Sequence, residues 1–417
     1  MVKTEQDSDP RVPVTILTGF LGSGKTTLLN HILTEQHGKK LAIIENEFGE
    51  VGIDDALLKK NTKLQSEEEI IEMMNGCICC TVRQDLVVVL KRLKERVDRG
   101  DLKLDGIVIE TTGLADPAPV AQTFFVEEEV QQFSRLDGIV TLVDAKHIEQ
   151  HLDAEKPEGA ENEAVEQVAF ADRMLLNKTD LVEEADLVRI EKRLKSINTN
   201  APIVRCTQSK VSPDSVLNIR GFDLDKTLEM DPEFLNTEGE HEHDDTVTSC
   251  SIVEKGSVDF EKIQSYIMRL LREKGTDIYR MKGVLSVAHC KKKFVYHAVH
   301  MIFGGDFAEE WGEDEERVSK LVFIGKNLDH EELKREFVDA RFDQDAFEEQ
   351  KRNLRFKVGD EVTCNATDGW ADGVVVKQMY RSEFMPPGFV APYQIKLTNG
   401  TLIYAPMDTD ELIKKRA

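Results

Sequence analysis

The stretch VTILTGFLGSGKTT at residues 14–27 decides the fold. Its centre, GFLGSGKT from Gly19 to Thr26, has the glycine and Lys-Thr spacing of a phosphate-binding loop. The apolar run before it predicts a strand and the residues after it predict a helix, which is the context that such a loop requires. A glycine turn that merely caps a helix is the weaker interpretation. We expect nucleotide phosphates to contact Gly19, Phe20, Leu21, Gly22, Ser23, Gly24, Lys25, Thr26 and Thr27.

The surrounding sequence predicts an α/β domain over residues 13–221. Short apolar runs such as LAII, GIVI, GIVTLV and MLLN alternate with helical stretches at 26–36, 82–97 and 183–196. This alternation is typical of a mainly parallel sheet covered by helices. The loop at Gly19 would then lie at the carboxyl end of the first strand.

The tetrapeptide NKTD, from Asn177 to Asp180, predicts guanine as the base of the nucleotide. A carboxylate at Asp180 can accept hydrogen bonds from the N1–H and the 2-amino group of guanine, whereas adenine lacks this donor pattern. Taken alone the tetrapeptide is also a common turn, but downstream of a phosphate loop it favours GTP over ATP. We expect Asn177, Lys178 and Asp180 to bind the base.

A third segment, IETTG, ends at Gly113 and lies between the first two. Glu110 closes an apolar strand, where an acidic residue can hold the water shell of Mg²⁺, and the Gly113 N–H can sense the γ-phosphate. We expect Lys25, Thr26 and Glu110 to act in hydrolysis, with Thr26 as the protein's Mg²⁺ ligand. No glutamine follows Gly113, so the residue that orients the attacking water is not identified, and intrinsic hydrolysis should be slow.

Three of the chain's seven cysteines, Cys77, Cys79 and Cys80, fall within NGCICC. Neighbours this close are poorly placed for disulfides, and three thiolates favour a soft metal such as Zn²⁺ over a buried structural role. A fourth ligand could be water, a partner's side chain or a carboxylate of the segment ENEFGE, namely Glu45, Glu47 or Glu50. That segment follows the second strand, so the metal could be coupled to the nucleotide; a solvated loop is the plainer interpretation.

The rest of the chain divides by composition. We expect a disordered tail at 1–12, an acidic linker with histidines at 222–246, and a small α+β domain at 247–340. A charged helical connector at 341–353 would lead to a small, bent all-β barrel at 354–412, because short alternating strands there are separated by glycine turns.

Charge and hydropathy exclude two classes of partner. The net charge of −24 repels nucleic acid, and no apolar run is long enough to span a bilayer, so we expect neither nucleic acid nor membrane as a partner. The acidic first residues lack the apolar core of a signal peptide, which predicts a cytoplasmic protein with reduced thiols.

These motifs together resemble the CobW family, in particular its zinc-regulated GTPase metalloprotein activators. The resemblance rests on TILTGFLGSGKTTLLNHIL, IENEFGEVGIDD, NGCICCTVR, ETTGLADPAPV and LLNKTDLV, and it extends over about residues 13–340. It implies a P-loop GTPase domain, a CobW C-terminal domain, GTP with Mg²⁺, and zinc held by Cys77, Cys79 and Cys80. The barrel is an addition to the family layout and looks like a Tudor module, for which we expect a protein partner.

The resemblance implies a zinc metallochaperone that hydrolyses GTP and passes zinc to client metalloproteins of unknown identity. One alternative is a GTPase that inserts cobalt or iron in a cofactor pathway. The other is a metal store or adaptor without catalysis, in which the nucleotide has only a structural role.

Overall fold

We describe a computed structural model of the chain that covers residues 9–35, 38–45, 69–72, 81–113, 115–156, 162–221, 247–312, 314–366, 369–382 and 384–416. The tail at 1–8, the linker at 222–246, the three cysteines at 77–80, Glu47, Glu50 and the side chain of Glu45 lie outside these residues. The expectations for them stay predictions.

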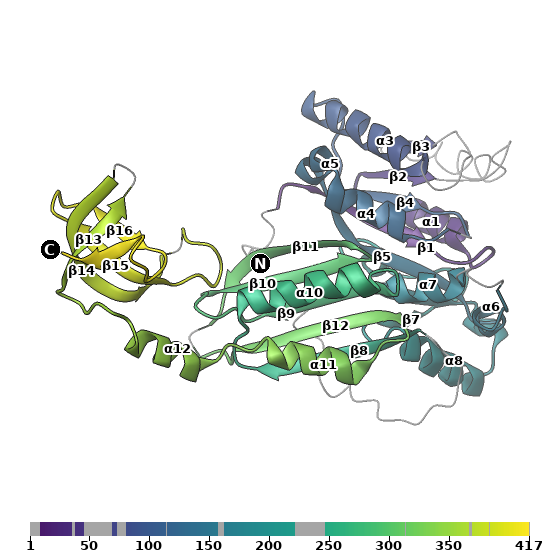
Figure 1. Cartoon of the computed structure of the whole chain (residues 1–417). Helices are drawn as coiled ribbons and strands as arrows, with labels where there is room; N and C mark the ends of the chain where they lie inside the picture. Colours follow the sequence, from purple (N-terminus) through teal and green to yellow (C-terminus); the bar gives the residue numbers. More distant parts are fainter. Residues whose placement is uncertain are drawn as a thin grey trace.

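The first domain is built on a seven-stranded sheet in the order β3-β2-β4-β1-β5-β6-β7 (Figure 1). Every strand pair in this sheet is parallel, as the alternating sequence predicts. The strands are β1 (Val12–Thr18), β2 (Leu41–Glu45), β3 (Glu69–Glu72), β4 (Gly106–Glu110), β5 (Ser134–Asp144), β6 (Arg173–Asn177) and β7 (Ile203–Arg205).

Helices cover both faces of this sheet. One face packs against α1 and the segment 206–219, through Leu17 on the strand side and Leu28 and Ile32 on the helix side. The other face packs against a larger set of helices. The helices are α1 (Lys25–Thr34), α3 (Thr81–Asp98), α4 (Ala118–Val126), α5 (Glu128–Phe133), α6 (Ile148–Leu152), α7 (Glu163–Phe170) and α8 (Glu184–Ile197), with 3₁₀ turns at Thr179–Leu181 (η2) and Pro213–Ser215 (η3).

The second domain is a five-stranded antiparallel sheet in the order β11-β10-β9-β12-β8 with two helices on one face. Its elements are β8 (Val247–Lys255), α10 (Phe260–Lys274), β9 (Ile278–Leu285), β10 (Lys292–Val299), β11 (Ile302–Glu310), β12 (Val318–Lys326) and α11 (His330–Asp339). Helices α10 and α11 close one hydrophobic core with the sheet.

The opposite face of the second sheet lies on the first domain. Tyr279, Val299 and Val322 belong to the same continuous core as the helices of the first domain. Strand β11 contacts α4, β9 contacts α7, and β8 contacts α8 (Figure 1). The two domains therefore share one core and bury a common apolar interface, which joins them more firmly than a linker would.

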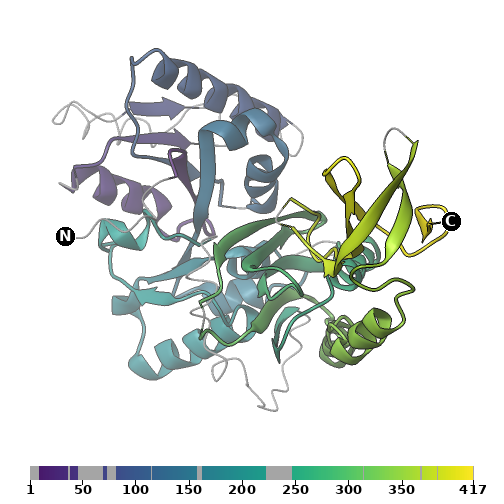
Figure 2. The same cartoon turned by 90° about the vertical axis from the view of Figure 1, so that its left-hand side faces the viewer.

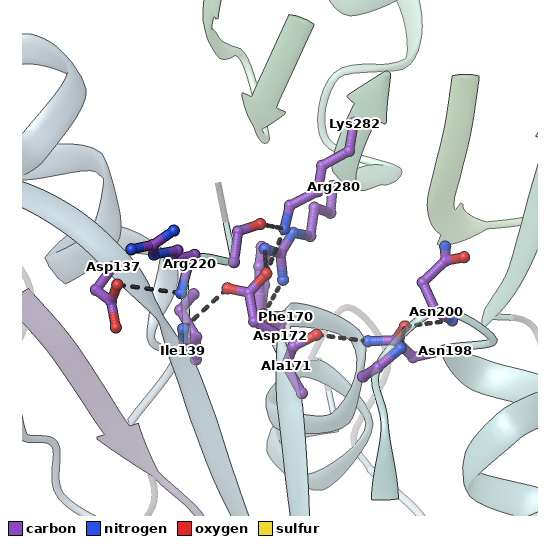
Figure 3. A network of polar contacts seen from close by, with 12 residues as sticks. Asp137, Ile139, Phe170, Ala171, Asp172, Asn198, Asn200, Arg220, Arg280 and Lys282 are labelled. Atoms are coloured by element: carbon purple, nitrogen blue, oxygen red, sulfur yellow. Dashed lines mark hydrogen bonds and ion pairs between the residues drawn. The ribbon is translucent and has the colours of Figure 1, made fainter. Parts of the chain in front are cut away.

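A buried ionic network lies at this junction (Figure 3). The carboxylate of Asp172 accepts hydrogen bonds from Arg280, Lys282 and the Ile139 N–H. Burial opposes ionisation, yet the two cations keep the pKa of Asp172 below its usual value. Burial and the charge of Arg280 lower the pKa of Lys282 to about 8, because two cations share one carboxylate. Lys282 also donates to the Gly221 carbonyl, so the network joins β5, the residue before β6, β9 and the end of the first domain.

The barrel lies outside the shared core, although its Arg381 donates to Cys290 Sγ of the second domain at 3.4 Å. Helix α12 (Gln344–Arg352) leads to β13 (Glu361–Ala366), β14 (Gly369–Tyr380), β15 (Ala391–Leu397), β16 (Leu402–Ala405) and β17 (Ile413–Lys415), all antiparallel in the order β16-β15-β14-β13-β17. It has its own small core around Tyr393 and Ile395. Figure 1 shows it at the left, past α12, and in Figure 2 it is among the parts nearest the viewer. Its last strand lies past residue 412, where the sequence predicts the barrel to end.

Candidate nucleotide and metal site

The phosphate loop connects the end of β1 at Thr18 to the start of α1 at Lys25. Gly19, Gly22 and Gly24 all have positive φ, at 143°, 78° and 110°. A Cβ on Gly19 would lie 2.3 Å from the Leu142 carbonyl oxygen, and one on Gly24 would lie 2.6 Å from Asn177 Nδ2. Glycine is therefore required at these two positions by close packing as well as by conformation.

Lys25 is folded back over the loop. Its Nζ donates to the carbonyls of Gly19 at 2.7 Å and Phe20 at 3.3 Å, and the residue is buried. Burial lowers the pKa of the Lys25 ammonium, and the nearby Glu110 carboxylate opposes this effect. A buried ammonium held by carbonyls favours an anionic ligand, because phosphate oxygens would supply the compensating charge.

Glu110 ends β4 beside β1 and β2. The next residue, Thr111, donates its N–H to Leu17 O at 2.9 Å and its hydroxyl to Thr18 Oγ1 at 2.9 Å. Further along, Gly113 packs against the phosphate loop, because a Cβ there would lie 2.6 Å from Leu21 N. We call residues 111–113 and 115–117 the Gly113 turn. This turn and the phosphate loop are in direct contact.

Asn177 joins three segments of the candidate base site. Its Nδ2 donates to Ser23 O at 2.9 Å and to Ser209 Oγ at 2.9 Å, and its Oδ1 accepts from Ser209 N at 2.9 Å. Ser209 Oγ donates in turn to Gly24 O at 3.0 Å. Asn177 is buried, so its amide fixes the end of β6 against the phosphate loop.

The next residues of NKTD turn toward solvent. Lys178 adopts a left-handed conformation with φ 63°, and its Nζ donates to Asp144 Oδ2 at 2.7 Å. His147 Nδ1 lies 3.0 Å from the same oxygen. Burial opposes ionisation of Asp144, but these partners hold the pKa of its carboxyl below the usual value. Asp180, in η2, is exposed and available to a ligand.

Sequence reasoning missed three residues of this site: Asp144, Ser209 and Gln167. Asp144 is the last residue of a buried strand, as Glu110 and Asn177 are. A polar residue at that position could have been recognised in the sequence as a candidate for the site. Ser209 follows β7 in a turn with φ 55°, and the sequence offers no signal for it. Gln167 reaches the Gly113 turn from α7, a contact that only the fold creates.

The strands that precede the segment ENEFGE and the cysteine segment end together. In the sheet Glu45 of β2 pairs with Glu72 of β3 on one side and with Glu110 of β4 on the other. The segment containing Glu47 and Glu50 starts after Glu45, and the cysteine segment starts after Glu72 and ends where α3 begins. Both segments therefore leave the sheet at the edge that carries the candidate phosphate site.

The four cysteines that the structure describes, Cys206, Cys250, Cys290 and Cys364, are buried and form no disulfide. Burial raises the pKa of the thiols of Cys206, Cys250 and Cys364 to about 11. Within the described ranges no three His, Cys, Asp or Glu residues gather as a metal site. In that same part of the chain no helix is long and apolar enough to cross a membrane.

A parallel sheet with a phosphate loop after its first strand and NKTD after β6 defines a P-loop GTPase fold. The chain belongs to the CobW family. Residues 13–205 match the family model of the CobW/HypB/UreG nucleotide-binding domain, and residues 247–341 match that of the cobalamin synthesis protein cobW C-terminal domain. The resemblance predicted from the motifs is thereby confirmed.

Named relatives and a solved structure match between half and four-fifths of the chain. The zinc chaperone YjiA of Escherichia coli (strain K12) is 37% identical over 330 residues, which are 79% of this chain and 99% of YjiA. A crystal structure of Zn(II)-bound YjiA GTPase from Escherichia coli superimposes with a TM-score of 0.61 at 31% identity, covering 80% of this chain and 99% of that one. The zinc-regulated GTPase metalloprotein activator 1 of Dictyostelium discoideum is 39% identical over 246 residues; the match spans half of that relative and 52% of this chain.

Proposed function

We propose that this protein is a GTP-hydrolysing zinc metallochaperone that passes zinc to client metalloproteins. The observation that carries the proposal is the register of the first sheet. Glu45, Glu72 and Glu110 are paired neighbours, so the carboxylate and cysteine segments both begin beside the candidate phosphate site. The names of the relatives, a zinc chaperone and a zinc-regulated GTPase activator, support the same function.

In this proposal the nucleotide is held from two ends. On nucleotide binding, the Lys25 ammonium donates to the β- and γ-phosphates in place of the two loop carbonyls. The backbone N–H groups of residues 19–27 surround these phosphates. Asp180 accepts from the guanine edge, while Asn177 and Lys178 fix the segment that presents it. Thr26 is the second residue of α1, and its hydroxyl would bind Mg²⁺. Glu110 would accept hydrogen bonds from the water shell of the ion, and the ion would neutralise charge on the phosphates.

Zinc is the cargo. We assign Cys77, Cys79 and Cys80 as its thiolate ligands and Glu45, Glu47 and Glu50 as candidates for a fourth. GTP would order the two segments at one edge of the sheet and tighten the metal site, and hydrolysis would loosen it at the client. We place this exchange in the cytoplasm, where thiols stay reduced.

The test is the zinc affinity of the full chain, measured by competition with a chromophoric chelator. We expect binding at least tenfold tighter with Mg²⁺ and a non-hydrolysable GTP analogue than with GDP or without nucleotide. Cys79→Ser should abolish this zinc binding, whereas Cys364→Ser, which changes a buried cysteine of the barrel, should leave it unchanged. Equal affinities in all three nucleotide states would refute the coupling.

The identity of the metal needs a separate measurement. Thiolates favour zinc, but affinity order alone does not determine which metal a protein holds in a cell. Metal analysis of the protein purified from its own cells should show zinc. Cobalt or iron in stoichiometric amount would instead indicate a GTPase of another cofactor pathway, and client activation by Lys25→Ala would indicate a metal store or adaptor.

A further inference from the structure

Gln167 is a buried residue of α7 whose side chain contacts the Gly113 turn. Its Nε2 donates to the Gly113 carbonyl at 3.2 Å and to the Ala115 carbonyl at 3.3 Å. Its own backbone carbonyl accepts from Thr141 Oγ1 on β5 at 2.6 Å. Only 2% of Gln167 is exposed, so water cannot replace this amide as a donor to the two carbonyls.

The turn that Gln167 holds lies between the phosphate loop and the second domain. On one side Gly113 packs against Leu21 of the phosphate loop. On the other side the turn leads into α4, which contacts β10 and β11. Gln122 of α4 donates to Val299 O at 3.4 Å, and the Phe125 ring lies 4.9 Å from the His297 ring. A shift of the Gly113 turn would therefore move a helix that rests on the second sheet.

Helix α7, which carries Gln167, also contacts the second domain directly. Phe170, one turn after Gln167, accepts a hydrogen bond from Arg280 through its carbonyl, and its ring lies 5.8 Å from the Tyr279 ring. Tyr279 and Arg280 both belong to β9. One short helix thus holds the Gly113 turn at one point and the second domain at another.

We propose that Gln167 is a positioning residue that makes the GTPase site distinguish GTP from GDP and transmits the difference to the second domain. With Gln167 in place, the Gly113 N–H stays fixed where a γ-phosphate would reach it. Without Gln167, part of the binding free energy of GTP must be spent on ordering the Gly113 turn, so GTP affinity falls. GDP has no γ-phosphate to contact the turn, so its affinity changes little. This inference rests on the phosphate site proposed above.

The test compares Gln167→Ala and the isosteric Gln167→Glu with the unchanged protein. We expect the affinity for a non-hydrolysable GTP analogue to fall about tenfold in Gln167→Ala, as the loss of two buried hydrogen bonds implies, with GDP affinity within twofold. Gln167→Glu should lose at least as much, because its carboxylate faces two carbonyl oxygens. The matched control is Asn198→Ala.

Asn198 is buried and donates to the carbonyls of Val168, Ala169 and Ala171 at the end of α7, but not to the Gly113 turn. The Asn198→Ala variant should therefore be less stable than the unchanged protein but should keep the same ratio of GTP to GDP affinity. An unchanged ratio in both Gln167 variants, or an equal change in Asn198→Ala, would overturn the proposal. Lys25→Ala distinguishes failure of the Gln167 proposal from failure of the proposed phosphate site. If Lys25→Ala retains full affinity for both nucleotides, the phosphate site itself is wrong.

Trp311 provides a readout in the second domain. It is one of two tryptophans, lies directly after β11, and packs against Val284 of β9. In a Trp370→Phe background its emission should change when the GTP analogue replaces GDP, and this change should be lost on adding Gln167→Ala. Emission that responds equally with and without Gln167 would refute the transmission to the second domain.

Discussion

Asp172→Asn tests whether one buried charge holds the first and second domains together. The side chains of Asp172 and Arg280 are 3% and 4% exposed, and Lys282 shares the same carboxylate. Removing one member of a buried ion pair costs about 3–5 kcal/mol, because its partner is left without compensation. Lys282 can lose its proton, since its pKa is already lowered to about 8. The guanidinium of Arg280 cannot, so we expect most of the cost to come from Arg280.

The assay is equilibrium denaturation followed by circular dichroism and by tryptophan emission. Because one apolar core runs through both domains, we expect both to lose stability together in Asp172→Asn, by about 3–5 kcal/mol. Arg280→Met added to Asp172→Asn should restore part of the loss, since it removes the cation that was left uncompensated. The asparagine amide oxygen can still accept from the Ile139 N–H, but its Nδ2 would then face the donors of Arg280 and Lys282, so the loss includes these two hydrogen bonds as well as the charge.

An exposed ion pair is the control. Glu149→Gln breaks the pair with Arg189, whose side chain is 58% exposed, and should cost less than about 1 kcal/mol. Two results would refute the reasoning: a loss in Asp172→Asn no larger than in this control, or a double variant no more stable than Asp172→Asn.

Three further predictions concern folding stability at acidic pH, the phosphate loop and the barrel. Burial, with the charges of Lys282 and Arg280, lowers the pKa of His297 from 6.5 to about 4, so the unfolded chain takes up this proton first as pH falls. Stability should therefore fall by up to about 3 kcal/mol between pH 6.5 and 4, and a stability profile of His297→Gln should be flatter there. Gly24→Ala should lower GTP affinity more than tenfold in a binding titration and more than Gly22→Ala does, because a Cβ on Gly24 would lie 2.6 Å from Asn177 Nδ2 whereas one on Gly22 meets nothing within 4 Å and adds only the strain of its positive φ. A chain ending at residue 353 should keep its calorimetric midpoint for the shared core within a few degrees, because the barrel has a separate core.

The parts of the site that are contiguous in sequence could be predicted from sequence. The phosphate loop needs its glycines and Lys25 within eight residues, and Asn177, Lys178 and Asp180 lie together after one strand. Residues that act across the fold could not. Gln167 meets the Gly113 turn only because α7 packs beside β5, and a buried glutamine on a helix has no distinguishing pattern.

The relation between the two domains was also beyond the sequence. An amphipathic strand shows which face is apolar but not which neighbour covers it, so Tyr279 and Val299 read equally well as the core of an independent domain. The Asp172 network has the same difficulty, because the two cations that pair with Asp172 are more than a hundred residues away. The zinc ligands remain a prediction, since Cys77, Cys79 and Cys80 lie outside the described residues.

Three of the buried cysteines, Cys206, Cys250 and Cys364, have a consequence for the chemistry of the folded chain. At neutral pH a thiol with a pKa of about 11 is almost wholly protonated, so it neither attacks electrophiles nor captures soft cations. We therefore expect a gentle alkylating reagent to spare Cys206, Cys250 and Cys364 and to report on Cys77, Cys79 and Cys80. Cargo offered to the native protein would likewise meet few competing sulfurs in the body of the fold.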